Sequence, residues 1–153
     1  MDAVAQLVEI EAIKRLKAKY FRCLDTKDWE GWLAVFTDDV TLTFDTAVST
    51  GGQDGRPAPS LVGKAALAEF VVNDLRTATT VHHGHTPEID FMSEAEANGV
   101  WAMSDIVDHG DNVLYGEGHY RETYRKLDGE WRIASVHLTR IRLGQQMRGR
   151  IKL

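Results

Sequence analysis

Apolar positions in the first quarter of the chain recur every three or four residues, a spacing that predicts two helices. The apolar positions of the first segment, residues 3–24, are Leu7, Ile10, Ile13, Leu16, Tyr20 and Leu24. Those of the second, residues 28–36, are Trp29, Trp32, Leu33 and Phe36. Asp28 is a residue type that caps helix starts. The short connection between the two helices predicts an antiparallel pair.

The spacing of apolar residues then changes. Residues 40–44, VTLTF, alternate between apolar and polar side chains and are rich in β-branched residues, which predicts a strand. The next segment, 45–60, is rich in Gly and Pro and predicts a long loop, which we expect to act as a lid. Helical spacing returns over residues 64–76.

The second half of the chain is strand-like. The predicted strands are residues 80–91, 99–109, 115–127 and 130–143. Asp128-Gly129 between the last two is a hairpin signal. The final segment, 144–153, is basic and predicts a flexible tail. Helices first and strands last indicate an α+β fold, with three helices on a curved antiparallel sheet of mixed strand order. Such a cone has a central pocket at its open mouth.

Length and charge narrow the possible partners. A chain of 153 residues fits one domain, 1–153. The net charge of −5 argues against a nucleic-acid partner. The absence from the sequence of a stretch of about 20 apolar residues argues against a membrane partner. The single cysteine, Cys23, and the lack of a signal-peptide pattern predict a cytoplasmic protein.

One short stretch, TTVHHGHTPEIDF (79–91), concentrates candidate chemistry. His82 can act as a base near neutral pH, and Asp105 on the next strand could orient its ring. The alternative is that both are ordinary polar strand residues. Strand alternation places His83 and His85 on the face opposite to His82.

Two further readings concern this stretch. His83, His85 and Glu88 could bind a metal ion, although we expect no metal and no other cofactor. A β-bulge at Gly84 and Pro87 would reset the alternation, so His85 stays a candidate for the pocket.

Tyr20 and Asp25 extend the candidate site to the first helix. Tyr20 lies on the apolar face, where a buried hydroxyl needs a partner; it either donates to a substrate or packs in the core. Asp25 follows five residues later, about 140° around a straight helix. Asp25 could orient Tyr20, His82 or a water, and it can converge with Tyr20 only if the helix ends near Leu24. The alternative is a cap or turn residue between the two helices.

Several other side chains are candidates for lining the pocket. His137 shares strand parity with Trp131 and Ile133, which we expect to face the core. The full set of expected substrate-binding residues is His85, Tyr120, His137, Trp29 and Tyr115.

Four stretches carry a resemblance to a known family. They are YFRCLDTKDWEGWLAVFTDDV (20–40), Gly63 before the third helix, VHHGHTPEID (81–90) and DGEWRI (128–133). Over roughly residues 5–142 the chain resembles the nuclear transport factor two-like superfamily. Within it, the chain is similar to the SnoaL-like polyketide cyclases, scytalone dehydratase and bile-acid 7α-dehydratase. The resemblance implies the cystatin-like α+β cone, a fold that hosts many chemistries.

The resemblance also implies site residues. The implied catalytic residues are Tyr20, Asp25, His82 and Asp105. The interval of five residues between Tyr and Asp is closer to bile-acid dehydratase than to scytalone dehydratase. A catalytic His lies seven residues before an Ile, and an Asp follows the His by 23 residues. The resemblance leaves open whether Arg140 or Arg142 is shared.

We therefore expect a cofactor-independent lyase (dehydratase) or isomerase that acts on a cyclic, hydrophobic hydroxy-carbonyl compound of steroid, polyketide or aromatic type. His82 would abstract a proton and Tyr20 would assist. The alternative is a non-catalytic protein that binds small ligands, resembling the small subunit of ring-hydroxylating dioxygenases. Convergence of Tyr20, His82 and Asp105 within hydrogen-bond reach in one pocket would favour the enzyme, and scattered positions would favour the binding protein. The resemblance also implies a homo-oligomer, either a dimer or a trimer.

Overall fold

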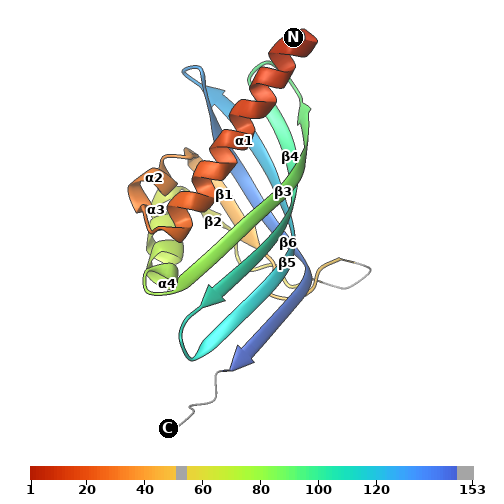
Figure 1. Ribbon diagram of the computed structural model, residues 1–153. Helices are drawn as coiled ribbons and strands as arrows, with labels where there is room; N and C mark the ends of the chain where they lie inside the picture. The colour runs from red at the N-terminus through yellow and green to blue at the C-terminus, as the bar shows by residue number, and fades with distance from the viewer. Residues whose placement is uncertain (51–54, 148–153) are drawn as a thin grey trace.

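A six-stranded sheet forms the body of the protein, and the helices cover its concave face (Figure 1). The computed structural model describes residues 1–50 and 55–147. The strands are β1 (Phe36–Phe44), β2 (Leu61–Val62), β3 (Thr79–Phe91), β4 (Glu96–Asp108), β5 (Asn112–Leu127) and β6 (Glu130–Met147). Their order is β2-β1-β6-β5-β4-β3, and only β1 and β6 run parallel. The expected α+β cone with a sheet of mixed strand order is confirmed.

The helices form two groups. The first group is α1 (Ala3–Asp25), which starts at the capping residue Asp2, and α2 (Trp29–Leu33), which Asp28 caps as expected. The second group is one continuous helical run made of α3 (Lys64–Leu67), the π-helical turn η1 (Ala68–Val72) and α4 (Asn73–Leu75). Helix α1 lies along the sheet, and its first turns project beyond one end of it (Figure 1). None of the helices in residues 1–50 and 55–147 has the length and apolar character to cross a membrane.

Two boundaries differ from the predicted ones. Strand β1 begins at Phe36 because this buried residue pairs with Ile133 of β6, a contact invisible in the local alternation. Strand β6 continues to Met147, because residues 144–147 pair with the start of β5. The first part of the predicted tail is therefore strand, and residues 148–153 lie outside the described residues.

The β5–β6 turn follows the predicted hairpin chemistry. Asp128 and Gly129 adopt φ angles of 51° and 81°, the two positive values of a type I′ turn. Leu127 and Glu130 pair on either side of it. The tight turn fixes which side chains of the two longest strands face the helices.

One face of α1 supplies the helical side of the core. Its buried positions are Ile13, Lys17, Tyr20, Cys23 and Leu24. They pack against the inward row of β5, in which Tyr120, Glu122 and Tyr124 are also buried. Two oppositely charged residues thus lie inside an otherwise apolar and aromatic core.

Candidate active site

A cavity of about 290 Å³ opens between the helices and the sheet. Its apolar wall includes Leu24, Leu42, Phe70, Leu114 and Leu138. Its buried polar residues are Tyr20, Asp45, His82, Asp105, Tyr120 and Arg140. An apolar cavity with a few converging polar groups is the usual form of a small-molecule site.

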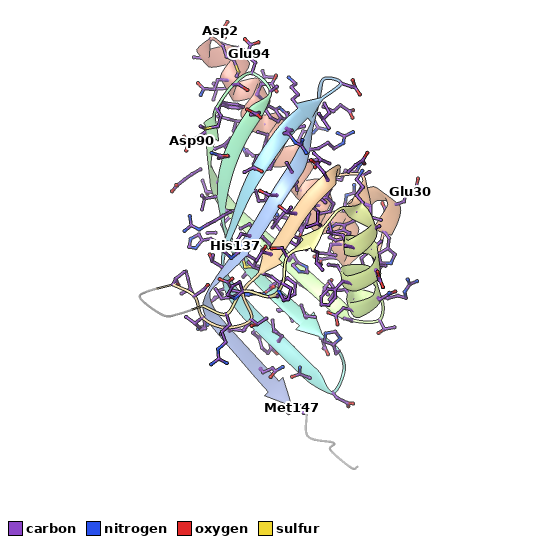
Figure 2. The ribbon with its side chains drawn as sticks, turned by 180° about the vertical axis from the view of Figure 1, so that it is seen from behind. Asp2, Glu30, Asp90, Glu94, His137 and Met147 are labelled. Atoms are coloured by element: carbon purple, nitrogen blue, oxygen red, sulfur yellow. The ribbon has the colours of Figure 1, made fainter. Side chains whose placement is uncertain are left out.

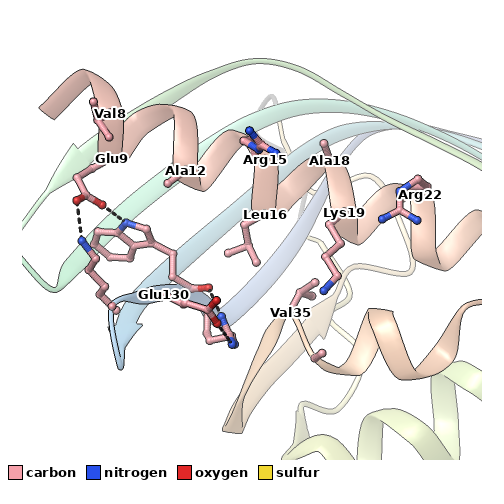
Figure 3. Close-up of a pocket in the computed structure, with 15 residues that line it drawn as sticks. Val8, Glu9, Ala12, Arg15, Leu16, Ala18, Lys19, Arg22, Val35 and Glu130 are labelled. Atoms are coloured by element: carbon pink, nitrogen blue, oxygen red, sulfur yellow. Dashed lines mark hydrogen bonds and ion pairs between the residues drawn. The ribbon is translucent and has the colours of Figure 1, made fainter. Parts of the chain in front are cut away.

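A wider hollow lies on the other side of α1, next to the β5–β6 turn (Figure 3). It measures about 830 Å³ and is open to solvent. Both of its carboxylates are engaged, since Glu9 accepts from Lys126 and Trp131, and Glu130 accepts from Arg132. The grouping of a base, buried phenols and a buried ion pair belongs to the smaller cavity, which we take as the candidate active site.

His82 is held by Asp25 through two contacts. The ring Nδ1 lies 2.7 Å from Asp25 Oδ1, and the backbone N–H of His82 donates to Oδ2 at 2.8 Å. Thr80 adds a hydrogen bond to Oδ1 at 2.9 Å. Because α1 ends at Asp25, this carboxylate can turn from the helix axis toward β3. With Nδ1 engaged by the carboxylate, Nε2 is the nitrogen available to a substrate.

The expected pairing of His82 with Asp105 is wrong. The two residues are directly opposite each other on β3 and β4, as their 23-residue interval suggested. However, the Asp105 carboxylate accepts two hydrogen bonds from Arg140, at 2.7 and 2.9 Å. The orienting carboxylate for His82 is instead Asp25, which the sequence placed in a supporting role.

The Asp105–Arg140 ion pair is almost fully buried. It crosses the inner face of the sheet above Gly116, where an added Cβ would come within 2.2 Å of both side chains. A glycine is therefore required for the pair to form. The Arg140 Nε–H is buried and has no hydrogen-bond partner among residues 1–50 and 55–147.

A bulge in β6 decides between Arg140 and Arg142. The pairing with β5 shifts between Glu117 and Gly118, because Ile141 is an extra residue on β6. Arg140 consequently faces the cavity, whereas Arg142 pairs with Glu117 on the outer face. Sequence alternation assigns both arginines to one face, so only the structure separates them.

Tyr20 and Tyr120 form the phenolic part of the site. Their rings are 6.0 Å apart in an edge-to-face arrangement, and both line the cavity. Burial, and secondarily Glu122, raises the pKa of Tyr20 well above its ordinary value. Burial likewise raises the pKa of Tyr120. Both hydroxyls therefore keep their protons at neutral pH and can act as hydrogen-bond donors.

Three of the expected substrate-binding residues lie outside the cavity. His85 is exposed, although the bulge between Gly84 and Pro87 does occur. Tyr115 is five positions from Tyr120, an odd interval, and is exposed on the outer face. Trp29 packs edge-to-face against Trp32, and Trp32 is the one that lines the cavity.

His137 is also outside the cavity. The register shift opposite Tyr124 makes Ala134 an extra residue, which reverses the alternation after Ile133. His137 is therefore partly exposed beside the segment that follows β1 (Figure 2). Its Nε2 lies 2.8 Å from Asp45, and this carboxylate lines the cavity in its place.

His83 is exposed on β3, as its strand parity predicted. No group of three or more His, Cys, Asp or Glu side chains suited to a metal ion occurs within residues 1–50 and 55–147. The structure adds three residues that the sequence did not single out as a site, namely Lys17, Asp45 and Glu122. Lys17 and Glu122 are polar at positions with core spacing, which is the signal that the sequence carried for them, whereas Asp45 begins the predicted loop and carried no such signal.

The contact between Asp25 and His82, called the dyad below, predicts that the stability of the fold depends on pH. Desolvation raises the pKa of Asp25, but hydrogen bonds from the His82 ring and backbone outweigh it and hold that pKa below its usual 3.8. A carboxyl with a lowered folded-state pKa stabilises the fold above its unfolded pKa, and this contribution is lost as the pH falls through the folded pKa. Asp25→Asn should therefore be less stable than the parent at neutral pH.

Urea unfolding midpoints measured from about pH 6 to about pH 2.5 would check this prediction, because the difference between the two proteins should shrink below about pH 4. The comparison with the parent removes the contributions of other carboxylates. Parallel curves over the whole range would contradict it.

The fold and the cavity define an α+β cone protein with a buried histidine held by a partly exposed carboxylate. A family model described as a SnoaL-like domain matches residues 5–137. The chain belongs to this family, which is part of the nuclear transport factor two-like superfamily.

Known relatives have several activities. The probable cyclase FGR4 of Gibberella zeae is 27% identical over 133 residues, which cover 84% of this chain and 89% of the relative. A structure from Novosphingobium aromaticivorans, described as a "Putative Scytalone Dehydratase", is 25% identical with a TM-score of 0.75, covering 97% of this chain and 93% of that one. A hexachlorocyclohexane dehydrochlorinase shares the fold at 16% identity, with a TM-score of 0.76 and coverage of 99% and 100%.

Proposed function

We propose that the protein is a lyase that removes water from a cyclic, largely apolar β-hydroxy carbonyl compound, using only its own side chains. The observation that carries the proposal is the His82–Asp25 pair in a buried cavity that also holds two phenols and the Asp105–Arg140 ion pair. The names of the cyclase and dehydratase relatives support the same class of reaction.

His82 is the proposed general base. Its Nδ1–H donates to Asp25, which fixes the tautomer and stabilises the imidazolium that forms when Nε2 takes a proton. The residue is buried at the cavity wall, so bulk water competes little for that nitrogen. Asp25 acts through His82 and is a positioning residue.

Tyr20 and Arg140 are the proposed donors to the substrate carbonyl oxygen. Tyr20 keeps its proton because burial raises its pKa. Arg140 is anchored by Asp105, and its Nε–H is left to donate. Fixed donors in a cavity with little water stabilise a developing enolate without reorganisation.

The reaction balances with no outside reagent. His82 Nε2 takes the proton on the carbon next to the carbonyl, and the electrons of that C–H bond form the enolate. The enolate then expels the β-hydroxyl as its C–O bond breaks. The imidazolium returns the proton to the leaving oxygen, so the products are water and an unsaturated carbonyl compound.

An activity assay tests the proposal. The probe is β-hydroxytetralone, a bicyclic β-hydroxy ketone that loses water to give a fluorescent naphthol. We expect naphthol to form faster with the parent protein than in buffer alone. Tyr20→Phe should still bind the probe but should turn it over more slowly. Binding is followed separately by the change in thermal unfolding midpoint.

The alternative function makes a different prediction. A binding or accessory protein would be stabilised by the probe and by related cyclic ketones but would leave all of them unchanged. Binding without turnover across such a panel would overturn the lyase proposal and favour the binding protein.

A further inference from the structure

A fully buried ion pair lies behind the two tyrosines of the cavity. Lys17 of α1 donates to Glu122 Oε1 of β5 at 2.5 Å, and both side chains have 0% exposure. Neither residue lines the cavity or contacts the proposed dyad. A buried Lys–Glu pair is costly to desolvate, and apolar residues of similar size often replace such pairs without loss of stability. Its presence therefore calls for an explanation other than stability.

The hydrogen bonds around Glu122 define its charge state. Trp101 Nε1 can only donate, and it donates to the Tyr124 hydroxyl at 2.8 Å. The Tyr124 proton is then directed to Glu122 Oε2, at 2.5 Å. Since Lys17 supplies the donor on Oε1, both oxygens of Glu122 accept. This arrangement suits a carboxylate on Glu122 and an ammonium on Lys17: burial lowers the pKa of Lys17, and the charge and hydrogen bond of Glu122 oppose that shift.

The other close contacts of the Lys17 ammonium are with aromatic rings. Its Nζ lies 3.8 Å from the centroid of the Tyr20 ring and 3.7 Å from that of Tyr120. Phe21 is the third ring, at 4.8 Å. A cation over a ring face is attracted to the π electrons, and the attraction is strongest where water is excluded. The same cation thus contacts both phenols of the cavity from behind.

We infer that Lys17 and Glu122 are positioning residues that fix the Tyr20 and Tyr120 rings and polarise their hydroxyls as donors to an anionic oxygen in the cavity. The cation withdraws electron density from each ring, and this strengthens the O–H donor at the far end. Glu122 holds the ammonium in place, and its own negative charge, which raises the pKa of Tyr20, acts against the cation, so Lys17 is the polarising group of the pair. The inference rests on the proposed function, because it gives those hydroxyls an oxyanion to stabilise.

The test variant removes both charges together. Lys17→Met combined with Glu122→Gln preserves side-chain volume, and Gln can still accept from Tyr124. The probes are para-nitrophenol, ionised at the working pH as a mimic of the enolate, and para-nitroanisole, its uncharged counterpart. We expect the double variant to bind the phenolate about tenfold more weakly or worse. Its affinity for the anisole should change less than about twofold.

The chain offers a matched control. Glu9 and Lys126 form another ion pair between α1 and β5, near the turn and away from the cavity (Figure 3). Glu9→Gln combined with Lys126→Met should leave both affinities unchanged. The inference would be overturned if the double variant of Lys17 and Glu122 kept the parent's affinity for the phenolate. It would also be overturned if the double variant lost affinity for both probes equally.

Failure of the proposed function gives another pattern. If the parent protein binds neither probe, the cavity is not the ligand site, and both proposals fall. If the parent binds the phenolate more tightly than the anisole yet turns over no hydroxy ketone, the lyase proposal fails. The inference about Lys17 and Glu122 would still hold.

NMR on the parent protein keeps the inference testable should the double variant not fold. Lys17 should give side-chain resonances of an ammonium group, with protons shifted upfield by the two ring faces. If Lys17→Met folds, loss of the ammonium signal in that variant assigns the signal to Lys17. If it does not fold, contacts between the ammonium protons and the protons of Tyr20 and Tyr120 give the assignment in the parent. A neutral amine, or an ammonium signal without the upfield shift, would overturn the inference.

Discussion

Replacing His82 with glutamine is expected to lower turnover of the β-hydroxy ketone by about two to four orders of magnitude. Glutamine can still hydrogen-bond to Asp25, so the fold around the dyad should persist. It cannot take up a proton near neutral pH, so the proposed general base is lost. The measurement is kcat and KM from naphthol release, with the thermal unfolding midpoint as a check on folding.

His83→Gln is the matched control for this prediction. The residue is adjacent in sequence and of the same type, but it is exposed on the other face of β3. Its turnover should equal that of the parent. If His82→Gln retained near-parent kcat, His82 would not be the base, and the cavity would need a different catalytic group.

The second large effect concerns stability. Asp105→Asn removes one charge of the buried pair and leaves the Arg140 guanidinium without the carboxylate that accepts its two hydrogen bonds. Breaking a buried pair from one side typically costs about 3–5 kcal/mol of unfolding free energy. Urea unfolding followed by tryptophan fluorescence should show this loss. Asp105→Asn combined with Arg140→Met should recover most of it, because no unpaired charge remains buried.

A neighbouring pair provides the comparison. Glu117 and Arg142 also join β5 to β6, but their side chains are 48% and 76% exposed. Glu117→Gln should change the free energy of unfolding by less than about 1 kcal/mol. Equal effects of the buried and exposed substitutions would show that Asp105 and Arg140 are solvated in solution, contrary to the structure.

Local sequence patterns were sufficient for most elements of this fold. The 3.6-residue spacing of apolar side chains predicted α1, and the Asp128-Gly129 signal predicted the β5–β6 turn. These features depend on interactions within a few residues, which the sequence displays directly. The start of β1 at Phe36 was missed because it depends on pairing with β6, almost one hundred residues away.

The candidate site was predicted in part. Tyr20, Asp25, His82 and Asp105 were named from residue types and intervals, and the cavity brings the buried ones together. Their partners were predicted only in part: His82 was one of three possible partners for Asp25, and Arg140 was not expected to hold Asp105. An interval of 23 residues placed Asp105 opposite His82 in the sheet, yet it could not say which neighbour the carboxylate would contact.

Bulges account for most of the errors in assigning side chains to faces. Period-two alternation is a reliable guide only until an extra residue enters a strand, after which every side chain changes face. The extra residues Ala134 and Ile141 in β6 moved His137 to the outside and separated Arg140 from Arg142. Nothing in the local sequence of β6 marks either position, since neither is Gly nor Pro.

The sequence by itself determined the order of helices and strands, the α+β class and the candidate base, because these follow from local periodicity and from residue chemistry. Only the tertiary structure decided that Asp25 holds His82, that Arg140 holds Asp105, and that Lys17 lies against two tyrosines. The reason is physical: each pairing joins elements distant in the chain, and its geometry depends on where α1 ends and where β6 bulges.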